Sequence, residues 1–229
     1  QMEKLVSQFT DYPNRDLLVK DLANKLAGDL RDVLAHQDRA SLIVPGGSTP
    51  GAIFDVLCDA NIDWASIDVM LSDERWVPET SERSNTKLLR KRLLVKRAAA
   101  ARFLPLYLPY SEPEEALIEL KQSCLHALPI SVLLLGMGTD MHTASLFPGA
   151  DRLDEALAVD APILLPMRAE GANEPRITLT APVLNGAKKK HLVIFGWEKR
   201  NALETAKSSP VRDAPVRAIM DNLMVYWAP

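Results

Sequence analysis

The sequence has little of what marks several common classes of protein. It holds only two cysteines in 229 residues, Cys58 and Cys124, and they fit neither a disulfide framework nor the spacing of metal ligands. No apolar run approaches the roughly 20 residues of a membrane span, and we expect no signal peptide before the first helix. These absences predict a cytoplasmic protein with reduced thiols, no bound metal and no membrane partner.

The sequence also lacks a strongly basic region. Its formal net charge is −3, with 27 basic and 30 acidic residues interspersed, whereas a nucleic-acid-binding face needs clustered cations. We interpret the basic triplet Lys188–Lys190 as a solvated surface turn. The composition, 47% hydrophobic and 25% charged, is that of an ordinary globular protein. We expect one domain over residues 1–229, with no nucleic-acid partner.

Apolar runs and turn residues alternate along the chain, which predicts alternating strands and helices. The expected strands are Ser41–Val44, Ile67–Leu71, Ser131–Leu135, Ile163–Leu165, Arg176–Thr180, Leu192–Phe195 and Leu223–Tyr226. The expected helices are Asp16–Leu34, Pro50–Asp59, Asn85–Leu94, Glu112–Leu128, Lys199–Lys207 and Pro215–Met220. This pattern favours the α/β class, with a mostly parallel sheet covered by helices on both faces. A small antiparallel portion is expected beside the strand that begins at Arg176.

The stretch LLLGMGTDMHTASLFPG, residues 133–149, is the most informative part of the chain. A predicted strand ends in a glycine turn that is followed by Asp140 and His142, two residues apart. Open α/β sheets bind ligands at the carboxyl ends of their strands, and the unperturbed pKa of histidine lies closest to neutral pH. A single histidine after a strand is more often structural than catalytic, but the carboxylate, the glycines and the hydroxyls around His142 favour acid–base chemistry.

Two other predicted strands end in polar loops. After the first, Gly46 and Gly47 precede a helix whose free N–H groups suit a phosphate or an oxyanion, although glycine turns before helices are common. After the second, Arg75 can grip a phosphate through two hydrogen bonds, or it can pair with Asp73 or Glu74. Because parallel strands present their carboxyl ends at one edge, we expect all three loops to converge there.

Other candidates carry weaker signals. Basic residues near later strands or in loops are Arg168, Arg176, Lys199 and Arg200, and Lys199 again follows the carboxyl end of a strand. We interpret His36, His126 and His191 as structural, since no polar cluster surrounds them in the sequence. The serine elbow G-x-S-x-G is absent, which argues against a serine-nucleophile hydrolase.

Four segments together resemble the 6-phosphogluconolactonases of the glucosamine-6-phosphate isomerase/6-phosphogluconolactonase family. They are VPGGSTP from Val44, SDERWVP from Ser72 with Ser84-Asn85, GMGTDMHTASLFPG from Gly136, and PRITL from Pro175. Their order and spacing match over nearly the whole chain. The related glucosamine-6-phosphate deaminases usually continue toward Phe-Asn-Glu-Pro-Gly and carry a Tyr where this chain has Arg75. The resemblance therefore favours the lactonases.

The resemblance implies a Rossmann-like fold of the NagB/RpiA type and hydrolysis of 6-phospho-D-glucono-1,5-lactone to 6-phospho-D-gluconate in the oxidative pentose phosphate pathway. It implies no cofactor and no metal. His142 would be the general base on water, and Asp140 would orient the loop or the imidazole. Arg75 and Lys199 would hold the phosphate, with Arg176 as a third candidate. The full set of expected substrate-binding residues is Gly46, Gly47, Ser48, Thr49, Asp73, Arg75, Asn85, Gly138, Ser145, Arg176 and Lys199.

The chain departs from the family at Met141, where a glycine is usual between the Asp and the His. A glycine there suggests a positive φ or a close approach to the ligand. We expect the loop to have relaxed to negative φ at Met141, with the methionine side chain covering the edge of the site.

Two alternative functions remain open. A deaminase of the same fold would convert glucosamine 6-phosphate to fructose 6-phosphate and release ammonia. A sugar-phosphate sensor, as in transcription regulators that use this fold, would need a helix-turn-helix segment, and the sequence has neither room nor a basic patch for one.

Overall fold

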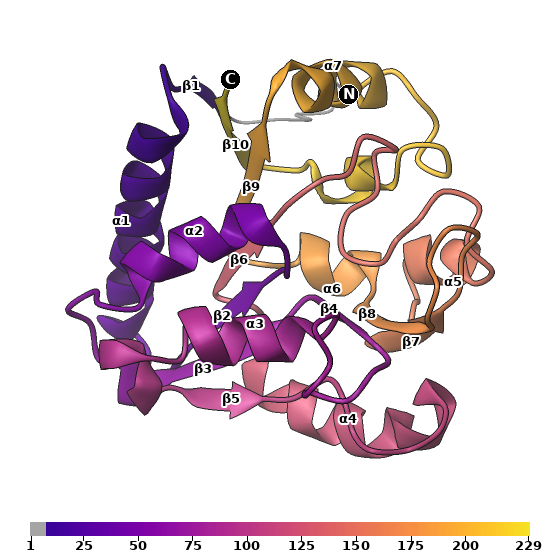
Figure 1. Ribbon diagram of the computed structural model, residues 1–229, viewed down its shortest axis with the longest axis horizontal. Coiled ribbons are helices and arrows are strands. Elements are labelled where there is room, and N and C mark those ends of the chain that lie inside the picture. The colour runs from indigo at the N-terminus through magenta and orange to yellow at the C-terminus, as the bar shows by residue number, and fades with distance from the viewer. Residues whose placement is uncertain (1–7) are drawn as a thin grey trace.

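A seven-stranded sheet, parallel throughout, forms the central layer of the protein (Figure 1). This computed structural model describes residues 8–229, so the expectations about a signal peptide and about a domain that starts at residue 1 lie in part outside the described residues. The strand order is β1-β10-β9-β6-β2-β3-β5. The strands are β1 (Gln8–Asp11), β2 (Ala40–Val44), β3 (Ile67–Leu71), β5 (Arg102–Leu104), β6 (Val132–Leu135), β9 (Lys189–Phe195) and β10 (Leu223–Ala228).

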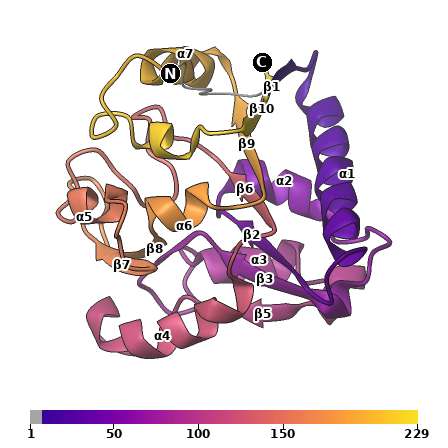
Figure 2. The ribbon, with the colours of Figure 1, turned by 180° about the vertical axis from the view of Figure 1, so that it is seen from behind.

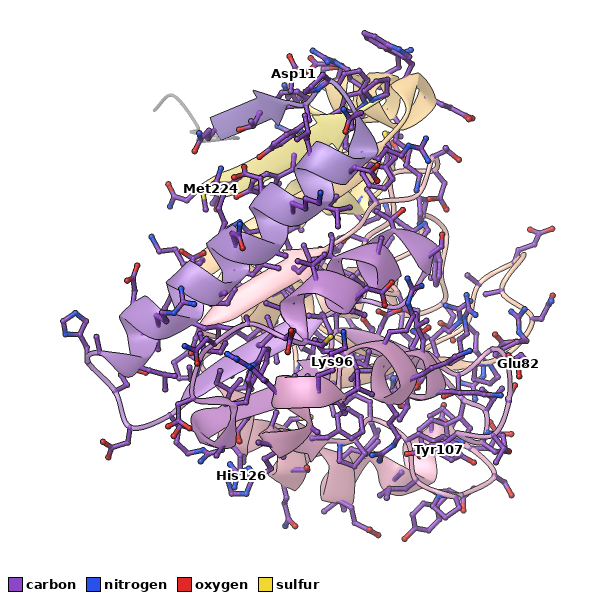
Figure 3. The ribbon with its side chains drawn as sticks, turned by 60° about the vertical axis from the view of Figure 1, so that its left-hand side comes forward. Asp11, Glu82, Lys96, Tyr107, His126 and Met224 are labelled. Atoms are coloured by element: carbon purple, nitrogen blue, oxygen red, sulfur yellow. The ribbon has the colours of Figure 1, made fainter. Side chains whose placement is uncertain are left out.

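Helices cover both faces of this sheet, as the apolar strand runs predict. Helices α1 and α2 lie across one face (Figure 3), and α4 and α6 lie on the other, which Figure 2 shows from behind. The helices are α1 (Arg15–Leu34), α2 (Ser48–Leu57), α3 (Asn85–Arg92), α4 (Leu117–Cys124), α5 (Leu153–Leu157), α6 (Ala181–Asn185) and α7 (Trp197–Ala206). Residues of β2 and β6 are fully buried because layers on both sides exclude water from them.

A second, antiparallel sheet stands beside the first. It has the order β4-β8-β7, with β4 (Asp73–Arg75), β8 (Arg176–Leu179) and β7 (Leu164–Met167). The antiparallel portion expected next to Arg176 is therefore confirmed. Its edge strand β4 follows β3 after one residue, so the chain leaves the parallel sheet at Ser72 and enters the small one at once.

The long helices and the central strands agree with the sequence-based expectations, and the strand at Ile67–Leu71 has the expected bounds. The segment expected as one helix from Glu112 to Leu128 instead consists of α4 between two 3-10 turns. The expected helix at Pro215–Met220 is a 3-10 helix. Strands β1, β4 and β5 and helices α5 and α6 were not expected, because three to five residues carry almost no periodic signal.

The basic triplet before β9 corrects another expectation. Lys189 and Lys190 belong to β9 rather than to a surface turn. Lys190 is 4% exposed, and its ammonium donates a hydrogen bond to the side-chain oxygen of Asn185 (2.5 Å). Pairing of β9 with both β6 and β10 extends the strand into the lysines, and local composition does not reveal such tertiary pairing.

Each helix within residues 8–229 is too short or too polar to cross a lipid bilayer.

Candidate active site at the carboxyl edge of the sheet

A cavity of about 270 Å³ opens where the loops after β2, β3 and β6 meet, which confirms the expected convergence. The start of α7, after β9, closes a further side. Most of the expected site residues lie in its wall, and only Asp140 and Ser145 do not. The lining residues are Pro45, Gly46, Gly47, Ser48, Thr49, Pro50, Asp73, Arg75, Asn85, Gly136, Met137, Gly138, His142, Ala144, Arg176, Val193 and Lys199.

The start of α2 forms one wall. Gly47 is the N-cap of α2 with φ of 105°, a conformation that other residues adopt only with strain, and no side chain caps the helix. The first N–H groups of a helix have no partner within the helix, and they carry a partial positive charge. An anionic oxygen in the cavity would therefore find donors next to Ser48 and Thr49.

His142 faces the cavity from the turn after β6. Its ring Nδ1 lies 2.5 Å from Asp140 Oδ1, and the same oxygen accepts the backbone N–H of His142 (3.0 Å). A Cβ on Gly138 would lie 2.4 Å from the imidazole, so only glycine allows the ring to fold over this turn. Asp140 thus holds the ring through Nδ1, and this contact does not involve Nε2.

The charge state of Asp140 supports this orientation. Burial acts to raise the pKa of its carboxyl, but the hydrogen bonds from the ring and the backbone of His142, together with the charge of His142, outweigh burial and hold the pKa below its ordinary value. Asp140 is therefore ionised at neutral pH. An ionised carboxylate at Nδ1 favours the tautomer with the proton on Nδ1 and stabilises an imidazolium once Nε2 takes a proton.

The expectation for Met141 is wrong. Its φ is 69°, in the left-handed region, and its side chain does not line the cavity. The backbone N–H of Met141 donates to Gly138 C=O (2.9 Å), and its C=O accepts the N–H of Val216 (3.0 Å). These two hydrogen bonds hold the turn in the shape that brings His142 to the cavity, so the surroundings maintain the strained conformation.

Asp73 is the carboxylate in the wall, and two hydroxyls hold it. Ser72 Oγ donates to Oδ1 (2.8 Å) and Ser145 Oγ donates to Oδ2 (2.6 Å). Ser145 is fully buried. It therefore lies behind the wall as a support for Asp73, which corrects its expected place among the residues that touch substrate.

Glu74 has a structural task that the sequence did not reveal. Its buried carboxylate accepts hydrogen bonds from the hydroxyl of Thr86 (2.6 Å) and from the backbone N–H groups of Arg75, Asn85 and Thr86 (each 2.8 Å). Burial raises the pKa of this carboxyl, and these hydrogen bonds oppose the rise. Through these contacts the carboxylate joins β4 to the start of α3. It does not form the ion pair with Arg75 that the sequence left open as an alternative. The sequence feature that could have indicated this contact is the helix start at Ser84-Asn85-Thr86.

Two arginines, Arg75 and Arg176, also line the cavity. Arg75 and Arg176 occupy directly opposed positions in β4 and β8. The Arg176 guanidinium lies over the ring of Phe147 (5.3 Å), and the same ring contacts the imidazole of His142 (4.6 Å between centroids). Burial lowers the pKa of Arg176 from its ordinary value, and Arg75 and Arg83 act in the same direction against Asp73 and Glu174. A buried cation in this setting is stabilised by an incoming anion.

The remaining basic and histidine candidates lie elsewhere. Arg168 pairs with Glu112 and Glu114, and Arg200 stacks on Trp227, so neither lines the cavity. His36 and His126 are exposed, and Figure 3 shows His126 at the surface.

His191 is buried, with its two ring nitrogens next to Asp29 Oδ2 (2.7 Å) and Tyr226 Oη (2.8 Å). This polar cluster was invisible in the sequence because Asp29 lies 162 residues away along the chain.

Comparison with known proteins gives consistent matches. The family described as Glucosamine-6-phosphate isomerases/6-phosphogluconolactonase matches residues 13–227. The chain is 41% identical to a 6-phosphogluconolactonase of Rhizobium meliloti, over 95% of this chain and 97% of the relative. It is 44% identical to one of Pseudomonas aeruginosa, over 92% and 90% of the two chains.

Solved structures also match this chain. A crystal structure of a 6-phosphogluconolactonase from Shewanella baltica superimposes with a TM-score of 0.94 at 31% identity, over 99% of this chain and 100% of the other. A monomeric glucosamine-6-phosphate deaminase matches with a TM-score of 0.79 at 15% identity, covering 96% and 97% of the two chains, which shows a shared fold alone.

Proposed function

This chain belongs to the family of glucosamine-6-phosphate isomerases and 6-phosphogluconolactonases, and we propose that it hydrolyses 6-phospho-D-glucono-1,5-lactone to 6-phospho-D-gluconate in the oxidative pentose phosphate pathway. The observation that carries the mechanism is the His142–Asp140 pair beside a cavity with three cationic side chains in its wall. We also propose that residues 1–229 act as one catalytic domain in the cytoplasm.

His142 is the general base. Its Nε2 accepts a proton from a water molecule as the water oxygen attacks the lactone carbonyl carbon, and a tetrahedral oxyanion forms. The C1–ring oxygen bond then breaks, and Nε2 returns the proton to the departing ring oxygen, which becomes the product's hydroxyl. A lactone carbonyl is already electrophilic, so a base contributing roughly 10²–10⁴-fold suffices without a covalent nucleophile or a metal.

Asp140 and the start of α2 assist at two points. The Asp140 carboxylate stabilises the imidazolium that exists between the two proton transfers, because it contacts Nδ1. The N–H groups near Gly46–Ser48 stabilise the oxyanion, since preorganised donors aimed at developing charge are among the strongest contributions to catalysis.

The cations of the wall bind the substrate's phosphate. Arg75 and Lys199 are the principal candidates, and Arg176 is the third. A phosphate dianion held away from the carbonyl fixes the sugar ring relative to His142, and such positioning converts binding into rate.

The direct test is proton release from freshly generated 6-phosphogluconolactone, compared with its spontaneous hydrolysis. We expect the protein to accelerate release and the His142→Ala variant to lose most of the acceleration. Release at the spontaneous rate would contradict the proposal. Ammonia release from glucosamine 6-phosphate would instead support the deaminase alternative.

A further inference from the structure

Glu174 and Arg83 do not line the cavity, but both contact Arg75, which does. Both carboxylate oxygens of Glu174 accept hydrogen bonds from the Arg83 guanidinium, from Nε (3.1 and 2.9 Å) and from Nη2 (2.8 Å). The Glu174 side chain is only 12% exposed. The hydrogen bonds from Arg83 lower the pKa of this carboxyl even though burial opposes them, so Glu174 is a fixed negative charge at neutral pH.

The same carboxylate faces the two arginines of the wall. Glu174 Oε1 lies 3.8 Å from Arg75 Nε and 3.9 Å from Arg176 Nη2. Both distances allow attraction between charges but exceed hydrogen-bond length. The Nε atoms of Arg75 and Arg176 are buried and have no hydrogen-bond partner among residues 8–229. The two guanidinium groups are therefore held near Glu174 by charge rather than by hydrogen bonds to it.

The pairing of β4 with β8 explains why a carboxylate is needed there. Arg75 and Arg176 are directly opposed across the two strands, and like charges in that arrangement repel each other. Glu174 lies within 4 Å of both guanidinium groups and offsets this repulsion. Arg83 in turn holds Arg75 through its backbone C=O, which accepts from Arg75 Nη1 (3.1 Å).

The local charges leave an excess of positive charge that favours a phosphate. Three guanidinium groups surround one glutamate, and Asp73 is the nearby carboxylate in the cavity wall. A phosphate monoester carries about −1.5 to −2 charges at neutral pH, and its oxygens match the fork of donors on a guanidinium.

We propose that Glu174, held by Arg83, is a positioning and specificity-determining residue that holds the guanidinium groups of Arg75 and Arg176 in place in the cavity wall, where they bind the phosphate of the substrate. The proposal rests on the proposed function for the identity of that substrate. Under this proposal the Glu174 carboxylate strengthens phosphate binding, although its own negative charge repels an anion.

Positioning outweighs repulsion here for two reasons. The hydrogen bonds to Arg83 largely neutralise the carboxylate as seen from the cavity. The side chains of Arg75 and Arg83 are 33% and 47% exposed, so without Glu174 they are free to turn toward solvent, away from each other and from the cavity. Removing the Glu174 charge has two opposing effects on phosphate affinity. Loss of positioning weakens anion binding, whereas loss of repulsion strengthens it.

The experiment measures binding of inorganic phosphate to the whole protein by NMR titration, for wild type and Glu174→Gln. We expect Glu174→Gln to weaken phosphate binding about 5- to 20-fold, because charge-assisted hydrogen bonds lose their orientation. Glu174→Asp keeps the charge and should recover part of the loss. Glu155→Gln is the matched control, since Glu155 forms an equally close pair with Arg152 outside the cavity (2.8 Å), and it should leave binding unchanged.

Kinetics provide the second readout. In Glu174→Gln the KM for the phosphorylated lactone should rise by the same factor, with kcat and the activity on unphosphorylated gluconolactone nearly unchanged. Tighter phosphate binding, or equal losses on both lactones, would overturn the proposal. If Glu174→Gln fails to fold, Arg83→Lys takes its place, because it keeps the charge but loses the two-pronged contact, and it should weaken phosphate binding in the same direction.

The two proposals fail in different ways. A wild-type protein that binds phosphate but does not hydrolyse the lactone contradicts the proposed function alone. A wild-type protein that hydrolyses the lactone while Glu174→Gln binds phosphate as tightly as before contradicts the role of Glu174 alone.

Discussion

The two ends of β3 lie near carboxylate–arginine clusters that differ in how completely their charges are paired. Near the amino end, Asp68 accepts hydrogen bonds from Arg102 (2.7 and 2.8 Å) and from Arg39 (2.6 and 3.4 Å), and its side chain is 2% exposed. Beyond the carboxyl end, Glu174 is hydrogen-bonded by Arg83 alone, while Arg75 and Arg176 stay at ion-pair distance.

The difference separates a structural cluster from the proposed binding site. At Asp68 each guanidinium uses two donors on the one carboxylate, so the cluster joins β3 to β5 and to the loop before β2, and the carboxylate accepts from both arginines. In the cavity wall two buried Nε donors lack partners. Buried donors without partners cost free energy, and the proposed phosphate site would offset part of this cost. Incomplete pairing, rather than charge itself, is therefore what distinguishes the proposed binding end of the strand.

The largest expected effect is a loss of activity without a loss of folding. His142→Ala should lower kcat by roughly 10²–10⁴-fold, the usual size for the loss of a general base, while the far-UV circular dichroism stays that of the wild type. The proton-release assay measures it. A variant that keeps more than about half of the wild-type kcat would remove His142 from the mechanism.

Arg75→Ala tests the incompletely paired cluster. Its KM for the phosphorylated lactone should rise by about 10- to 100-fold, since charge-assisted hydrogen bonds to a dianion are lost. The KM for unphosphorylated gluconolactone should change little, because it presents no dianion to the guanidinium. Equal losses on the two substrates would show that Arg75 is structural.

Asp68→Asn tests the fully paired cluster. Because Arg39 and Arg102 are 41% and 46% exposed, the loss is smaller than for a buried ion pair, and the free energy of unfolding should fall by about 1–3 kcal/mol. Urea denaturation at neutral pH measures it. Activity at a temperature where both proteins are folded should stay the same, and a large loss of kcat there would break the contrast between the two clusters.

The same variant has a defined pH dependence. Burial acts to raise the pKa of Asp68, but the hydrogen bonds from Arg102 and Arg39 outweigh it and hold the pKa below the ordinary value of 3.8. A lowered carboxyl pKa stabilises the folded state above the ordinary pKa and loses that effect as pH falls through the folded-state pKa. The stability difference between wild type and Asp68→Asn should therefore narrow below pH 3.8.

Met141→Gly probes the strain stored beside the cavity. An L-residue at positive φ costs about 1–2 kcal/mol, and the added freedom of glycine in the unfolded chain offsets about 0.4–1 kcal/mol of the gain. Thermal or urea unfolding should show a stabilisation of up to about 1.6 kcal/mol. Ala144 also has a positive φ, 50°, so Ala144→Gly is a parallel variant that should be stabilised for the same reason. A loss of stability in both variants would show that neither position is strained.

The last prediction is that removal of metal ions has no effect. Incubation with EDTA should leave the lactonase rate unchanged, since the proposed route has no step that needs a Lewis acid. Loss of activity that zinc or magnesium restores would contradict the proposed mechanism at both the base and the oxyanion.

Much of the site was readable from the sequence because its signals are local. Apolar runs that end in polar or glycine turns placed Asp73, Arg75 and His142 just after predicted strands, and parallel strands bring their carboxyl ends together, so convergence followed from topology alone. The spacing of Asp140 and His142 within one turn predicted their proximity, and the structure shows the contact.

Other features depend on residues far apart in the chain. Arg83 and Glu174 are separated by 91 positions, and no local pattern links them. The three residues of β4 are too few for a periodic signal, yet their pairing with β8 sets Arg75 opposite Arg176. The φ of Met141 is maintained by a hydrogen bond from Val216, and Lys190 is buried by two neighbouring strands.

The sequence by itself determined the α/β class, the central strands, and which side chains stand at the functional edge, because hydrophobic period and turn chemistry act over a few residues. The tertiary structure decided which of those side chains line the cavity, which support it from behind, and which donors are left unpaired. Those outcomes depend on distances between segments that are remote in the chain, and only packing sets such distances.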